Sequence, residues 1–95
     1  MAQSYSVTRH AHERITARGI PAFIAGLIIE YGEPRDAGDG ALSYMLTKSS
    51  LREFRRVAGP TLTNLLSQYR SRNAYVVAAA GRIITVAFAS NHTNN

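Results

Sequence analysis

Apolar residues recur with a helical period in the first part of the chain. Val7, Ala11 and Ile15 are spaced four positions apart. This spacing predicts an amphipathic helix that runs to about Arg18 and stops at Gly19.

A second helix is predicted from Pro21 to about Gly32. Proline suits the first turn of a helix, where its missing N–H would be unpaired in any case, and glycine suits the end. The broad apolar face of this helix consists of Phe23, Ile24, Leu27, Ile28 and Tyr31. The next residues, 33–40 (EPRDAGDG), are rich in Gly, Pro and Asp and predict a turn.

Residues 41–48 alternate between apolar and polar and predict a half-buried strand. The segment SLRE, Ser50 to Glu53, matches a capping box, so a third helix is expected to start there. Gly59-Pro60 should break or kink this helix, which then continues over 61–70.

Two more strands, 75–80 and 82–89, are expected because both segments are rich in β-branched residues. The chain is expected to turn between them at Gly81. The complete pattern predicts a single α+β domain over residues 1–95. In this domain N-terminal helices pack on a small antiparallel sheet of three or four strands. An additional helical segment lies between the first strand and the C-terminal hairpin.

The composition is that of a globular protein, with 45% hydrophobic and 18% charged residues. The absence of cysteine excludes disulfides and thiolate metal sites. We see no signal peptide, and the longest apolar stretch, 20–29, is about half of what a membrane span needs. We therefore expect a cytoplasmic protein with no membrane partner.

The charge balance is the strongest indication of function in the composition. The net charge is +5, and ten of the eleven cationic residues are arginine, which suits bidentate phosphate recognition. A pI near 10 favours a nucleic-acid ligand. A basic composition without specific meaning and an acidic protein partner are the alternatives.

His10, Arg14 and Arg18 are four residues apart, so on a helix they share one face beside the Ala11/Ile15 stripe. Like charges at this spacing repel one another, and a bound anion would offset the repulsion. The alternative interpretation is a solvated basic face with an incidental histidine.

We expect no metal and no cofactor. His10 and His12 are two residues apart and would point to opposite sides of a helix, and His92 lies in the tail. No carboxylate cluster completes a metal site, and the sequence has no glycine-rich phosphate loop and no nucleophile elbow.

Further basic residues are candidates for binding nucleic acid, together with one tyrosine of the predicted first strand. The helix dipole is an alternative explanation for cations late in a helix, and ordinary solvation is one for cations at strand ends. The candidates are Tyr44, Lys48, Arg52, Arg55, Arg56, Arg70 and Arg72.

Residues 10–20 (HAHERITARGI) resemble a bacterial family of unknown function. Its mark is a histidine, an arginine four residues later, and then Arg-Gly-Ile. That family is usually placed with the BrnT-like and RelE-like toxins, in the fold shared with barnase and the colicin ribonucleases.

The resemblance implies a metal-independent endoribonuclease, the toxin of a toxin–antitoxin pair, with RNA and an antitoxin protein as partners. His10 would act as acid or base, and Arg14 and Arg18 would hold phosphate. In such toxins the sheet supplies the opposite side of the site, and the candidates from the predicted strands are Arg82, as a catalytic residue, and Lys48 and Tyr44. A non-enzymatic nucleic-acid-binding module and a protein-interaction domain are the alternatives.

Overall fold

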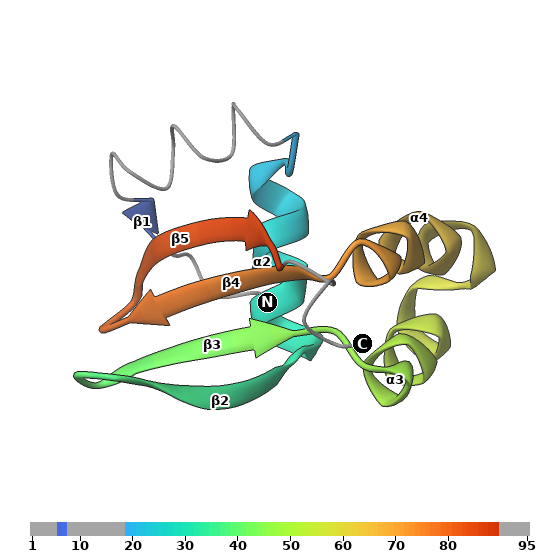
Figure 1. The fold of residues 1–95 in the computed structure, drawn as a ribbon. Helices are drawn as coiled ribbons and strands as arrows, with labels where there is room; N and C mark the ends of the chain where they lie inside the picture. Colours follow the sequence, from blue (N-terminus) through green and yellow to red (C-terminus); the bar gives the residue numbers. More distant parts are fainter. Residues whose placement is uncertain (1–5, 8–18, 90–95) are drawn as a thin grey trace.

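The computed structural model describes residues 6–7 and 19–89, which form an α+β fold (Figure 1). Its elements are β1 (Ser6–Val7), α2 (Ala22–Tyr31), β2 (Glu33–Gly38), β3 (Ala41–Met45), α3 (Lys48–Ala58), α4 (Pro60–Ser71), β4 (Ala74–Ala79) and β5 (Arg82–Phe88).

The sheet has the strand order β1-β5-β4-β3-β2. Strands β2 to β5 are antiparallel to their neighbours, and the two-residue β1 pairs parallel to β5. The helices α3 and α4 connect β3 to β4 and lie beyond one end of the sheet, as Figure 1 shows. The expected helical segment before the C-terminal hairpin is therefore present.

The core lies between α2 and one face of the sheet. Ile24 and Ile28 of α2 are almost completely buried, as are Val76 of β4 and Val86 of β5. The β-branched and alternating pattern of β4 produces this packing, because every second side chain of a strand points to the same face. Burial of such apolar side chains contributes about 1.5–3 kcal/mol each to stability.

The expected turn at residues 33–40 was wrong in part. Glu33–Gly38 forms β2, an edge strand in which every residue is exposed. Because no side of this strand is buried, its sequence does not alternate between apolar and polar residues. The turn is confined to its end, where Asp39 has φ 54° between two glycines with positive φ. The Asp36 carboxylate accepts a hydrogen bond of 3.0 Å from the Gly38 N–H there.

The expected start of the third helix at Ser50 was also wrong. The N-cap is Thr47, whose side chain accepts a hydrogen bond of 3.0 Å from the Ser50 N–H. The Ser50 hydroxyl accepts one of 3.0 Å from the Thr47 N–H in return. Ser50 is therefore the third helical residue and the last residue of the capping box, not its first.

The break at Gly59-Pro60 is confirmed. α3 ends at Ala58, Gly59 has φ 87°, and Pro60 is the first residue of α4. Glycine tolerates this left-handed conformation, and proline needs no hydrogen-bond acceptor at a helix start. The C-terminal hairpin is also confirmed, with one-residue differences at the strand ends.

The predicted arrangement of N-terminal helices followed by the sheet needs correction. Val7, expected on the first helix, lies in strand β1, and a strand hairpin of β2 and β3 directly follows α2. The rest of the predicted first helix, residues 8–18, lies outside the described residues.

Candidate nucleic-acid interface

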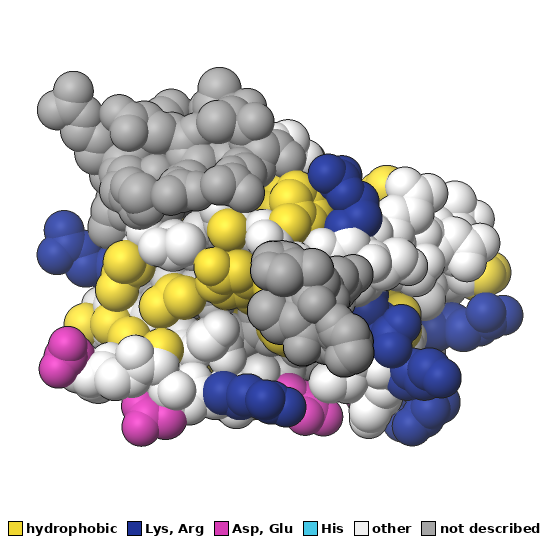
Figure 2. Space-filling model, in the orientation of Figure 1, with side chains coloured by type: hydrophobic (Ala, Val, Ile, Leu, Met, Phe, Trp, Pro, Cys, Tyr) yellow, Lys and Arg dark blue, Asp and Glu magenta, His cyan; other side chains and the backbone are white. Residues whose placement is uncertain are grey.

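Charge is unevenly distributed over the described residues. Residues 48–72, which contain α3 and α4, carry six cations and one carboxylate, a net charge of +5. Residues 19–47 and 73–89 carry two cations and four carboxylates, a net charge of −2. Figure 2 shows the same separation, with most Lys and Arg side chains over α3 and α4 and the acidic ones along β2 and its hairpin. We call residues 48–72 the basic lobe.

The cations of α3 share one side of the helix. Successive helical residues are about 100° apart, so Lys48, Arg52, Arg55 and Arg56 fall within an arc of about 100°. All four are exposed. Between Lys48 and Arg56 the helix rises about 12 Å, so the row could meet several consecutive phosphates of one strand.

The opposite side of α3 holds the helix on the protein. Phe54 is buried and contacts the Tyr31 ring edge-on, with the ring centroids 5.1 Å apart. Ser50 is buried within the capping box. The helix is therefore docked through its apolar side, which leaves the arginine side toward solvent.

One carboxylate shields this row in part. Glu53 accepts a hydrogen bond of 3.3 Å from Arg56, and both side chains are more than half exposed. Exposed ion pairs of this kind contribute little to stability, so another anion can replace Glu53 as the partner of Arg56. Arg52 and Arg55 form no ion pair in the described part of the chain.

The end of α4 adds two arginines to the basic lobe. The Arg72 guanidinium lies 3.9 Å from the centroid of the Phe88 ring. Arg70 is partly buried and lies in the last turn of α4. Its position also complements the negative end of the helix dipole, so the dipole explanation stays valid for Arg70.

The sheet brings α3 and α4 together. Met45, the last residue of β3, pairs with Tyr75 near the start of β4. Lys48 and Arg72 each lie three residues from this pair, so both helices join the sheet at the same end. Cations from two separate stretches of sequence are thereby collected in one lobe.

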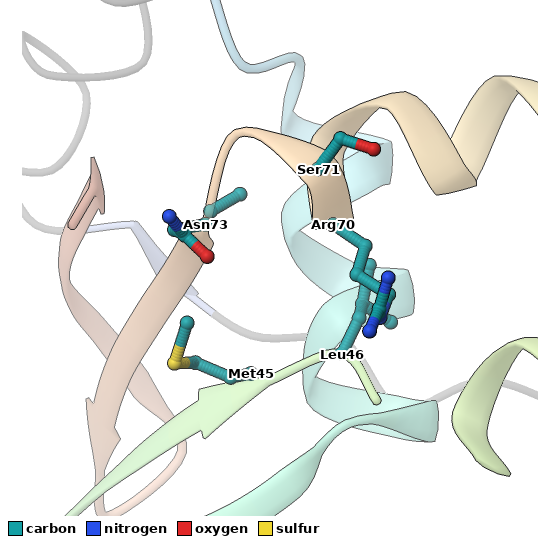
Figure 3. Close-up of a pocket in the computed structure, with 6 residues that line it drawn as sticks. Met45, Leu46, Arg70, Ser71 and Asn73 are labelled. Atoms are coloured by element: carbon teal, nitrogen blue, oxygen red, sulfur yellow. The ribbon is translucent and has the colours of Figure 1, made fainter. Parts of the chain in front are cut away.

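A hollow of about 230 Å³ lies at this junction (Figure 3). It is lined by Met45, Leu46, Arg70, Ser71, Asn73 and Ala74. Sequence reasoning found only Arg70 among these residues. The residue type of Asn73 could have predicted a special backbone position here. Asparagine is enriched among residues with positive φ, and the φ of Asn73 is 61°.

Two other candidates lie apart from the basic lobe. Tyr44 is partly buried and packs against the core, on the sheet face that meets α2. Arg82 is exposed at the start of β5, where it pairs with Ala79 at the far end of β4. Arg82 is also the register partner of Ser6 in β1.

His10, Arg14 and Arg18 lie outside the described residues, as do His12 and His92. In the part of the chain that the structure describes, no three His, Cys, Asp or Glu side chains form a group that could hold a metal ion. None of the helices described has both the length and the apolar composition of a membrane span.

No family model, no curated protein and no solved structure matches this chain. The resemblance of residues 10–20 to a bacterial family of unknown function therefore stays a prediction.

Proposed function

We propose that the protein binds nucleic acid, with RNA as the expected ligand, through the phosphates of one strand laid along α3. The observation that carries this proposal is the charge separation of the described residues: +5 in the basic lobe against −2 in the rest. Neutralising phosphates with arginine releases condensed counterions, which supplies most of the affinity of non-specific binding.

The proposal is tested with two variants of equal charge change. Arg52→Glu alters the exposed side of α3, and Arg35→Glu alters exposed β2 outside the basic lobe. Binding of a fluorescent single-stranded RNA is measured by anisotropy at several salt concentrations. We expect Arg52→Glu to weaken binding about tenfold and to reduce the log–log salt slope by about one unit. We expect Arg35→Glu to change the affinity less than about twofold.

Equal losses in the two variants would contradict the α3 interface, because they would mean that only the net charge matters. Wild-type protein that fails to bind RNA at low salt would contradict the proposal as a whole.

A second candidate is metal-independent RNA cleavage by a toxin, with His10 as acid or base and with Arg14, Arg18 and Arg82 as phosphate-binding residues. One observation favours it: Arg82 pairs with Ser6, four positions before His10. An arginine of the sheet is therefore placed beside the strand that leads into the histidine segment. A neutralising antitoxin protein belongs to the same proposal.

Cleavage of RNA in the presence of EDTA tests this candidate. We expect wild type to cleave and His10→Ala to lose activity by roughly 100-fold or more, because general acid–base catalysis contributes about that factor. Arg82→Ala should also lose activity, whereas Arg35→Ala serves as the control. Induction in growing cells should arrest growth only with the active forms. Equal cleavage by wild type and His10→Ala would refute the assignment.

A further inference from the structure

Arg72 is held against an aromatic ring at the end of the basic lobe. It is the C-cap residue of α4, and its N–H donates to the Gln68 and Tyr69 carbonyl oxygens at 3.3 and 3.2 Å. The carbon at the centre of its guanidinium lies over the Phe88 ring, 3.9 Å from the ring centroid. Phe88 is partly buried and packs against the core, so the ring is a firm support. Both the backbone and the side chain of this arginine are therefore held in place.

This contact sets Arg72 apart from the cations of α3. Within residues 6–7 and 19–89, it is the only cation that lies over an aromatic ring. A free arginine side chain loses much rotamer freedom when it binds a ligand, and a side chain that is already held loses less. Arg72 is therefore prepared for a contact that depends on orientation as well as on charge.

The ring covers one face of the guanidinium plane. Arg72 as a whole is exposed, so the opposite face is open to a ligand. Among the described residues no carboxylate pairs with Arg72. The N–H groups of a guanidinium lie along the edge of its plane, so an anion bound at the edge leaves the open face unused.

A flat and neutral π system is the ligand that suits this open face. Guanidinium planes stack on unpaired bases in RNA recognition, and the cation is attracted to the π electrons of the ring. A phosphate or a carboxylate would bind at the N–H edge instead. The bases of a duplex are stacked on one another, so the ligand has to be a base that has left any stack or pair.

The open face lies at the end of the molecule where phosphates are expected. The helices α3 and α4 join the sheet at the same end, as Figure 1 shows. Lys48, the first cation of the α3 row, and Arg72 are each three residues from the register pair of Met45 with Tyr75. A base stacked on Arg72 and phosphates bound by α3 therefore belong to the same basic lobe.

We infer that the open face of Arg72 stacks on one unpaired base of the bound RNA strand, an inference that rests on the proposed function. Arg72 contacts the base, and Phe88 is a positioning residue that supports the guanidinium from below. Every base has a π face, so the contact selects single strands over duplexes without selecting a sequence.

The test compares two single strands of equal length, one with bases and one with abasic sites, which keep the phosphates. Wild type should bind the strand with bases roughly three- to tenfold more tightly, near the lower end of the effect of one stacked base. It should also prefer this strand to a duplex of the same sequence. Fluorescence anisotropy measures all three affinities.

Arg72→Lys keeps the charge and removes the plane. We expect it to lose the preference for bases, while its affinity for the abasic strand changes less than about twofold. Arg35→Lys is the matched control, because Arg35 is an exposed arginine of β2 outside the basic lobe. It should keep the preference.

Two variants of the supporting ring test the role of Phe88. Phe88→Leu keeps an apolar side chain against the core but removes the ring, so the preference for bases should fall although Arg72 is intact. Phe88→Tyr keeps the ring and should keep the preference. A purely structural role of Phe88 would instead weaken the binding of both strands alike.

Other results would overturn the stacking site. Tight but equal binding of both strands by wild type would do so and would leave phosphate binding by α3 intact. A preference that survives in Arg72→Lys would place the stacked base elsewhere. Equal losses for both strands in Arg72→Lys would assign Arg72 to a phosphate. Failure of wild type to bind either strand would overturn the proposed function itself.

Discussion

Gly32 joins α2 to β2 where the backbone leaves no space for a side chain. A Cβ at this position would lie 2.9 Å from the Met45 carbonyl oxygen and would also collide with the Ile28 carbonyl oxygen. The Gly32 N–H donates to that Ile28 oxygen at 2.7 Å, so the helix end cannot shift away without losing a hydrogen bond. The sequence marks Gly32 as a helix stop, but the close approach of β3 comes from the tertiary fold.

At the residue scale we therefore expect Gly32→Ala to lower the free energy of unfolding by about 1–3 kcal/mol, because backbone atoms have to move. Gly26→Ala is the control: a Cβ at Gly26, inside α2, meets no atom within 4 Å. It should be neutral or stabilise by up to about 1 kcal/mol, because alanine favours a helix interior. Urea unfolding followed by circular dichroism measures both. A neutral Gly32→Ala would contradict the close packing of α2 on β3.

The element that carries the basic row begins at the Thr47 capping box. Of the residues in the SLRE motif, only Ser50 takes part in this cap, as its third helical residue. Local sequence alone allows either start, because serine and threonine are both good N-caps. The end of β3 at Met45 and the burial of Ser50 select Thr47. The row consequently starts at Lys48.

At the element scale we expect Thr47→Ala to lower the free energy of unfolding by about 0.5–2 kcal/mol, the usual cost of losing an N-cap. The Thr47 hydroxyl also lies 3.4 Å from the Glu33 carboxylate, as its donor, so the start of β2 loses a weak contact as well. Ser49→Ala, at an exposed position in the same first turn, should be nearly neutral. Thermal unfolding distinguishes the two. Similar melting temperatures for both variants would argue against the capping box.

At the scale of the whole molecule, the net charge of +5 equals the charge of the basic lobe alone, and the described residues outside this lobe carry −2. The field of such a concentrated positive charge attracts a polyanion before contact and is weakened by salt. The comparison of Arg52→Glu with Arg35→Glu belongs to this scale, because both variants change the net charge equally and only their position differs. The hollow and the arginine row lie at the same end of the sheet.

The sequence by itself determined the elements with a periodic pattern of apolar residues, which are α2, α3, α4 and the C-terminal hairpin. It also determined the break between α3 and α4 at Gly59-Pro60. It also determined the charge and the preference for arginine. Only the tertiary structure decided that Glu33–Gly38 is an edge strand, since a strand with no buried side leaves no pattern. The hollow likewise joins residues 45–46 to residues 70–74 through the register of β3 with β4. Such pairings depend on contacts between distant parts of the chain, and local periodicity carries no information about them.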